Sequence, residues 1–363
     1  MSIYCHSYTA GSLEDYLEII NFLNDCILSK YPGNYISRVH RMWYRGHEKQ
    51  DYVLLPSLQR NSKGAQTRYD RDHLREELRY QHFRSKCTQL VDTSPESKIE
   101  WLEILQHHLG STRLMDWSES ALSALMFALE AFIDPTKNRE LNFRRANMTP
   151  SVWVLDPVGL NLHIYDTLIK RKDLIAGAVQ DILVRAQEID SFCRYLAGQM
   201  ANKRDAYFEN RDESALSGIV CLSVIENERR TNAERLYNLL RNGEFNPFFY
   251  LLLRYYSDGL TLPMNTLPPL AIVHPYHSSR IQSQHGVFTV TPHYHIEPNQ
   301  VGSPLDTRPM EKQPIISDCL YKINITRPAK VAKELLTIGE RRVNLYPELD
   351  IYVRDMEIGE WQV

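Results

Sequence analysis

The sequence predicts an α+β protein with a central, mainly antiparallel sheet, flanking helices and a helical insertion. Short apolar or alternating runs, which are typical of strands, occur in both end parts of the chain. Apolar residues at three- and four-residue spacing, which are typical of helices, lie beside these runs and dominate the middle of the chain, from residue 159 to about 262. We therefore expect strands from the two end parts to pair across the helical middle.

Each expected element follows from a local pattern of this kind. The expected strands are Trp43–His47, Ser151–Asp156 with a stop at Pro157, Leu270–Pro275, Gly286–Thr291 and Tyr321–Ile325. The expected helices are Leu13–Leu28, His73–Leu90, a helix after Ser118, Ile182–Ala197, Asn232–Leu240, Pro328–Leu336 ended by Gly339, and a last one from Pro347. Ser217–Ser223 suits either a strand or a buried turn.

The stretch Gln106–Ser118 gathers histidine, arginine, aspartate and tryptophan just before an apolar helix. If its last residue is the N-cap of that helix, Asp116 and Trp117 lie at a helix N-terminus. Asp116 then has two interpretations. Its carboxylate satisfies backbone donors and the helix dipole, or it lines a cleft with Arg113 and His107 and holds a polar ligand.

A second cluster surrounds Arg45, which lies between large aromatic residues and Gly46 in the strand Trp43–His47. Arg45 is either an exposed residue at a strand end or a partly buried one that is directed at a carboxylate or phosphate. Gly46 would allow a ligand or another backbone to approach closely.

Four blocks, in this order, resemble the FRG domain family: Tyr44-Arg45-Gly46, Gln106–Ser118, Arg280–Phe288 and Leu345–Asp350. The first is similar to the Phe/Tyr-Arg-Gly signature that names the family, and the second to its Gln-His-x-Gly-x-Pro-Thr-Arg-Leu-Leu-Asp-Trp-Thr block. The chain has Leu109-Gly110-Ser111 where the family usually has Gly-x-Pro, so this turn is expected to have a different shape.

The resemblance divides the chain into the N-terminal part of an FRG domain (1–135), a mainly helical insertion (136–268) and the C-terminal part (269–363). It implies a distant likeness to ADP-ribosyltransferases and, in genomic style, to bacterial toxins and anti-phage effectors. The implied activity is an ADP-ribosyltransferase or an NAD hydrolase with NAD as its substrate. The implied partners are a macromolecular acceptor, protein or nucleic acid, and an antitoxin or regulatory protein.

Cleavage of the nicotinamide bond of NAD passes through an oxocarbenium-like state, so the site needs polar groups at the ribose and a cation at the pyrophosphate. On the resemblance, the expected catalytic residues are Arg45, Asp116 and Gln284, with Arg45 as the clamp and Asp116 or Gln284 on the ribose hydroxyls. Tyr44 or Trp117 would stack on the nicotinamide ring. The expected binding residues are Tyr44, Gly46, His107, Thr112, Arg113, Trp117 and Arg280.

ADP-ribosyltransferases usually carry a catalytic glutamate at the start of a late strand, and Gln284 lies near the expected place. Glu348 is the other candidate, although Pro347-Glu348 is also typical of a plain helix start.

Two other kinds of site are compatible with the sequence. Histidines cluster late in the chain and could bind a metal, at positions 274, 277, 285, 293 and 295. However, the chain has no His-Glu-x-x-His, and its six cysteines form no Cys-x-x-Cys pair, so we expect no metal. The second alternative is a non-catalytic module that senses a nucleotide or a partner.

Composition and charge restrict the setting. A net charge of −3 argues against a broad basic surface for nucleic acid. The first residues lack the pattern of a signal peptide, and no uninterrupted apolar run reaches membrane-spanning length, so we expect a cytoplasmic protein with no membrane partner. The signatures of dinucleotide folds, P-loop NTPases and serine hydrolases are absent from the sequence.

Overall fold

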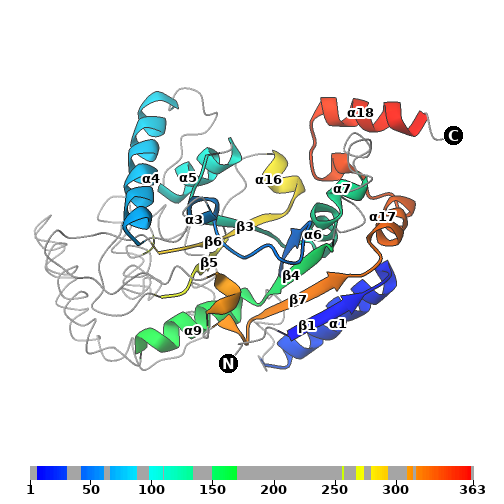
Figure 1. Ribbon diagram of the computed structural model, residues 1–363, viewed down its shortest axis with the longest axis horizontal. Coiled ribbons are helices and arrows are strands. Elements are labelled where there is room, and N and C mark those ends of the chain that lie inside the picture. Colours follow the sequence, from blue (N-terminus) through cyan, green and yellow to red (C-terminus); the bar gives the residue numbers. More distant parts are fainter. Residues whose placement is uncertain are drawn as a thin grey trace, which may run out of the picture.

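A seven-stranded sheet forms the centre of the computed structural model (Figure 1), which describes residues 6–30, 42–60, 66–87, 98–108, 110–133, 149–169, 256, 267–273, 279–292, 309–313 and 316–360. The strands are β1 (His6–Ala10), β2 (Trp43–His47), β3 (Leu114–Ser118), β4 (Ser151–Leu155), β5 (Leu270–Ile272), β6 (Gly286–Val290) and β7 (Leu320–Ile325). Their order is β1-β7-β4-β2-β3-β6-β5, and only the β1–β7 pair is parallel. The predicted α+β class with a mainly antiparallel sheet is therefore confirmed.

Helices cover this sheet and flank its ends. They are α1 (Leu13–Leu28), α3 (Ser57–Arg60), α4 (Gln66–Cys87), α5 (Lys98–His107), α6 (Ala121–Ala128), α7 (Glu130–Ile133), α9 (Pro157–Ile169), α16 (Ser279–Ser283), α17 (Pro328–Thr337) and α18 (Leu349–Glu360), with 3-10 turns η1 (Met310–Lys312) and η3 (Arg342–Asn344). In Figure 1, α1 and α17 lie beside the edge formed by β1 and β7, whereas α4 and α5 lie toward β3 and β6. None of the helices in the described ranges is long and apolar enough to cross a membrane.

Alternation along the strands produces two cores, one on each face of the sheet. Tyr44, Val152 and Val154 pack with α1, α6 and α17 on one face. Trp43, Trp153 and Leu155 pack with Leu160 of α9 on the other face. Successive side chains of a strand point to opposite faces of the sheet. Adjacent residues such as Trp43 and Tyr44, or Trp153 and Val154, therefore belong to different cores.

The two end parts of the chain pair within this sheet, as expected. Strand β3 runs antiparallel to β6, with Asp116 opposite Phe288, and places residues from positions 114–118 and 286–290 side by side. The segment 136–268 also contributes, because β4 lies between β2 and β7 in the centre of the sheet. The sheet thus extends into the range that the resemblance assigns to a helical insertion.

The expectation that Asp116 and Trp117 lie at a helix N-terminus is wrong. Residues 114–118 form strand β3, and helix α6 begins only at Ala121, where the side chain of Ser120 accepts a hydrogen bond from the Ser123 amide. The apolar residues of the motif alternate with polar ones and so pack on a sheet face, while Ser120 has the extended backbone of an N-cap. Asp116 therefore owes its position to a strand and its neighbours.

Some of the other described elements agree closely with the predictions, whereas α4 begins at Gln66 instead of His73, and α3, α5 and α16 were not among the expected helices. Helix α1 has the expected bounds, and α17 ends before Gly339, whose φ of 94° is readily adopted by glycine. The last helix begins at Leu349, with the carbonyl of Glu348 accepting from the Tyr352 amide. The helices predicted at 182–197 and 232–240 and the segment 217–223 lie outside the described residues. Strand β1 was not predicted, because this edge strand has only one buried residue, Ala10.

Candidate functional site

A cavity of about 310 Å³ opens where β2, β3 and β6 meet α5, α6 and α16. Its volume is in the lower part of the range for small-molecule sites. The cavity brings together most of the site residues predicted from the sequence, namely Tyr44, Arg45, Gly46, His107, Asp116, Trp117, Arg280 and Gln284. Thr112 and Arg113 lie outside its lining. Residues from three separate blocks of the sequence thus share one site.

Arg45 and Asp116 are joined through both the backbone and the side chain of the aspartate. Nη1 of Arg45 donates to the carbonyl of Asp116 and lies 3.7 Å from its Oδ2, while Nε donates to Nε2 of His47 at 3.2 Å. Strands β2 and β3 pair only at Tyr44 and Ser118, so the guanidinium supplies a donor where a backbone amide of β2 does not. Arg45 thus adds a side-chain contact between two strands whose backbone pairing is limited to one register position.

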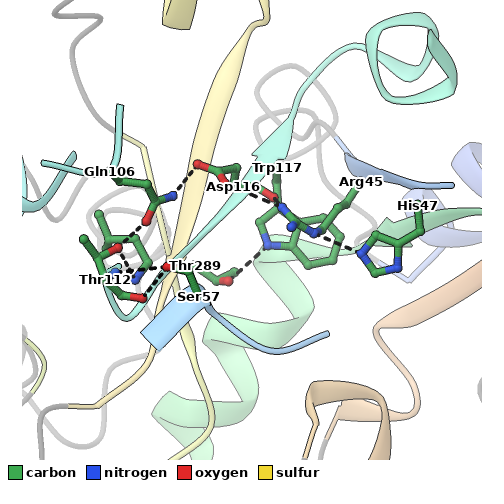
Figure 2. Close-up of polar contacts among 9 residues, drawn as sticks. Arg45, His47, Ser57, Gln106, Thr112, Asp116, Trp117 and Thr289 are labelled. Carbon is green, nitrogen blue, oxygen red and sulfur yellow. Dashed lines mark hydrogen bonds and ion pairs between the residues drawn. The ribbon is translucent and has the colours of Figure 1, made fainter. Parts of the chain in front are cut away.

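Figure 2 shows that Arg45 belongs to a longer chain of polar contacts. Asp116 Oδ1 accepts a hydrogen bond from Nε2 of Gln106, and Oε1 of Gln106 accepts one from the hydroxyl of Thr112. Thr112 is in turn fixed by Ser57, whose Oγ accepts from its amide at 3.0 Å. Thr112 does not line the cavity, but its hydroxyl donates to Oε1 of Gln106. The Nε2 end of the Gln106 amide therefore faces Asp116.

Asp116 is the accessible member of this network. Its side chain is 59% exposed, whereas that of Arg45 is 16% exposed. Burial lowers the pKa of the Arg45 guanidinium and the charge of Asp116 opposes this shift, so Arg45 remains a cation at neutral pH. The arrangement thus exposes the carboxylate of Asp116 in the cavity and places the less exposed guanidinium of Arg45 beside it.

Arg113 has a different place from the one expected. Its side chain is fully buried, with Nε 3.5 Å from Oε2 of Glu76 on α4, and its backbone amide donates to Oε1 of the same glutamate at 2.8 Å. Because both side chains are inaccessible, this ion pair holds α4 against the loop before β3. The contact explains an arginine at this position without a ligand.

Gly46 has the close backbone approach predicted for it. A Cβ atom built on Gly46 would lie 2.0 Å from the carbonyl oxygen of Ala124 and 2.6 Å from the amide of Ala128. The backbone of α6 therefore packs directly on β2, and only glycine leaves room for this contact.

Gln284 lies between α16 and β6, at the entrance to the strand as expected. Its Nε2 donates to the backbone carbonyl of Leu345 at 3.0 Å, and the backbone carbonyl of Gln284 accepts from the hydroxyl of Ser118 at 2.6 Å. These contacts connect the cavity wall to the block at 345–350. They also fix the amide so that its nitrogen faces Leu345, which leaves Oε1 as the acceptor end.

Arg280, Tyr346 and His107 lie at the α16 side of the cavity. The guanidinium of Arg280 lies over the ring of Tyr346, 4.8 Å from its centre. Burial lowers the pKa of His107, and the charges of His108 and Arg280 add to the shift, so His107 is neutral at pH 7. Burial raises the pKa of Tyr346 to about 12, which keeps its hydroxyl protonated.

The large aromatic residues of the cavity differ in how much of their ring is available. Tyr44 and Trp117 are buried, and Nε1 of Trp117 donates to Oγ1 of Thr289 at 3.0 Å (Figure 2). Burial also raises the pKa of the Tyr44 hydroxyl. Phe127 of α6, which also lines the cavity, is only partly buried.

Seven lining residues were not among the predicted site residues: Glu103, Gln106, Ser118, Phe127, Ile281, Gly286 and Phe288. Glu103 and Gln106 are three positions apart on α5, so they share one helix face. Glu103 is 2% exposed, which is uncommon for a glutamate. The spacing was visible in the sequence, but only the structure turns this face of α5 toward β3.

Four of the five clustered histidines, at positions 274, 277, 293 and 295, lie outside the described residues. Within the described ranges, no three histidine, cysteine, aspartate or glutamate side chains are grouped as metal ligands. His285 is exposed and has a positive φ of 49° in the turn before β6.

Comparison with known families identifies one match. Residues 40–137 match the family model of the FRG domain, and this range includes Arg45, Gln106 and Asp116. The chain therefore carries an FRG domain, as the sequence blocks predict. Neither a curated protein nor a solved structure matches the chain significantly.

Proposed function

We propose that this chain, which carries an FRG domain, is an NAD-consuming enzyme, first an ADP-ribosyltransferase and second an NAD hydrolase. The observation that carries the proposal is the presentation of Asp116 in the cavity, with Gln106 on one carboxylate oxygen and Arg45 beside the other. A carboxylate held in this way can stabilise a sugar cation as it forms.

The reaction requires the bond between C1′ of the ribose and the nicotinamide nitrogen to break, with the electron pair leaving on nicotinamide. The ribose becomes an oxocarbenium-like cation, and a nucleophile on the acceptor, or water, forms the new bond at C1′. In the proposed arrangement Asp116 lies beside the ribose, and Oε1 of Gln284 accepts a hydrogen bond from a ribose hydroxyl. The buried Glu103 lines the same cavity.

Aromatic and basic residues supply the rest of the proposed site. Phe127 replaces Tyr44 and Trp117 as the ring expected to stack on nicotinamide, because it is the less buried of these lining residues. Arg45 acts through Asp116 instead of as the pyrophosphate clamp, because its Nε and Nη1 already have acceptors in the protein.

The biological setting belongs to the same proposal. A role as a bacterial toxin or anti-phage defence protein rests on the family resemblance, as does an antitoxin or regulatory partner. The acceptor is a protein or a nucleic acid. We propose that the chain acts in the cytoplasm without a membrane partner, where cysteines such as Cys26 and Cys87, free in the structure, stay reduced.

The test is incubation of the purified chain with NAD labelled in the adenine and a cell extract, alongside Asp116→Asn. Label on a macromolecule that depends on Asp116 supports a transferase and identifies the class of acceptor. Nicotinamide release without label transfer indicates a hydrolase. Absence of both, with the chain folded, overturns the enzymatic proposal.

A binding module that senses a nucleotide is the second candidate. It is favoured by the contacts of Asp116, whose two carboxylate oxygens already face Gln106 and Arg45, as suits a group that organises a binding cleft. This candidate predicts saturable nucleotide binding with no release of nicotinamide.

A further inference from the structure

The cavity is lined by two arginines, and their surroundings differ. Arg45 is held by the protein, since its Nε donates to His47 and its Nη1 to the Asp116 carbonyl. Moving it onto a ligand would break these contacts and release Asp116. Arg45 is therefore poorly suited to follow a ligand that enters and leaves.

Arg280 has the opposite character. Its guanidinium carbon lies over the ring of Tyr346, 4.8 Å from the ring centre. A guanidinium that stacks on an aromatic face keeps its N–H donors for other partners. Within the part of the chain that the structure describes, no group accepts a hydrogen bond from this guanidinium and no carboxylate forms an ion pair with it. A stacked arginine with open edge donors is pre-organised for a bidentate contact with an anion.

The neighbours of Arg280 suit the same ligand group. His107 lies on the adjacent wall and is neutral at pH 7, so its ring can donate one hydrogen bond without requiring a counter-charge. Asp116, by contrast, lies on β3 and makes its part of the cavity unsuitable for an anion. Among the lining residues, Arg280 on α16 and His107 on α5 thus provide donors, whereas Asp116 on β3 provides the accessible carboxylate and Glu103 on α5 a buried carboxyl group.

We propose that Arg280 binds the diphosphate of a nucleoside diphosphate ligand, whose sugar lies toward Asp116. This inference rests on the proposed function, because it assigns an orientation to the substrate of the same site. It also removes the diphosphate from Arg45, where the sequence had suggested it. The cavity would then select ligands that carry two linked phosphates over nucleosides, which have the sugar and the base but no phosphate.

The test is equilibrium binding by calorimetry of ADP, AMP and adenosine to the wild type, Arg280→Gln and Arg280→Lys. We expect ADP to bind at least ten times more tightly than adenosine. Arg280→Gln should weaken ADP binding by ten- to a hundredfold and leave adenosine unaffected. Arg280→Lys, which keeps the charge but loses the planar fork, should fall between the two. Arg327→Gln, at an exposed arginine before α17, is the matched control and should bind like the wild type.

Circular dichroism and thermal unfolding establish that each variant is folded. Equal ADP affinity in the wild type and Arg280→Gln would overturn the inference, as would an equal loss for adenosine or a failure of the wild type to bind ADP. The outcome is separable from that of the proposed function. ADP binding that depends on Arg280, without consumption of NAD, supports the inference and refutes the enzyme. Consumption of NAD with ADP binding that is independent of Arg280 does the reverse.

Discussion

Nη1 of Arg45 donates to the backbone carbonyl of Asp116 and lies 3.7 Å from the Oδ2 atom of the same residue. The side chain of Arg45 thus contacts both the backbone and the carboxylate of Asp116. Strands β2 and β3 pair at a single register position. The guanidinium of Arg45 therefore also supplies a hydrogen bond between the two strands where no backbone pair is formed. Under the proposed function, Arg45 is therefore a positioning residue for Asp116.

Replacement of Gly46 by alanine should destabilise the protein by about 3 kcal/mol or more, because the new methyl group would overlap the backbone of α6 at Ala124. Urea unfolding measures the change. Gly11→Ala is the control, since its nearest neighbour would be the Thr326 hydroxyl at 3.3 Å, and it should change stability by less than about 1 kcal/mol. Similar losses in the two variants would contradict the close packing of β2 on α6.

Replacement of Arg113 by methionine should cost about 3–5 kcal/mol of unfolding free energy, because it leaves the carboxylate of Glu76 buried without its partner charge. Adding Glu76→Gln should recover much of this loss. The glutamine removes the charge, and its Oε1 can still accept from the amide of residue 113. Chemical denaturation of both variants gives the comparison, and a loss below about 1 kcal/mol for the single variant would show that the ion pair is dispensable.

His47 should make the protein less stable in mild acid. Burial, aided by the charge of Arg45, lowers the pKa of His47 from 6.5 to about 3. Between these values the unfolded chain binds a proton that the folded protein does not, so stability is complete above pH 6.5 and falls as the pH decreases toward 3. The expected contribution is a loss of about 2 kcal/mol between pH 7.5 and pH 5.

The variant His47→Gln tests this contribution, because an amide oxygen can accept from Nε of Arg45 but does not titrate. Its unfolding free energy should depend less on pH than that of the wild type over the same interval. Parallel curves for the two proteins would show that His47 is not the group responsible.

The hydroxyl of Thr112 should influence any turnover from outside the cavity. Thr112→Val keeps the shape but removes the donor that orients the Gln106 amide, so the turnover number should fall by about tenfold. Thr112→Ser restores the hydroxyl and should recover most of the activity. The rate is expressed per folded molecule, so a purely structural role for Thr112 would leave valine and serine variants alike in turnover number.

Local patterns were sufficient to predict much of the sheet. Strands β2, β4 and β6 contain many apolar or aromatic residues, which predicted these segments as strands. We expected strands from the two ends of the chain to pair because pairing buries these side chains. Strand β3 was not among the expected strands, because its polar residues, Asp116 and Ser118, obscure the alternation with buried Met115 and Trp117. Strand β1 offered no apolar signal, since it completes an edge and leaves most of its residues accessible.

The candidate site was predictable as a set of residues but not as a set of contacts. The motifs place Arg45, Asp116 and Gln284 in one cavity, as expected. Sequence proximity could not reveal that Arg113 turns away toward Glu76, which is 37 positions earlier in the chain. Nor could it reveal that Arg45 already has acceptors in the protein, because these contacts depend on how β2 pairs with β3.

The most direct measurement is the rate of nicotinamide release from NAD by the wild type, Asp116→Asn and Asp51→Asn. Asp116→Asn keeps the shape of an exposed side chain and removes only its charge, and Asp51 is an exposed aspartate outside the cavity lining. The proposed function predicts release by the wild type and Asp51→Asn, and a loss of at least about a hundredfold in Asp116→Asn. Equal rates in all three proteins, or no release by the folded wild type, would contradict it.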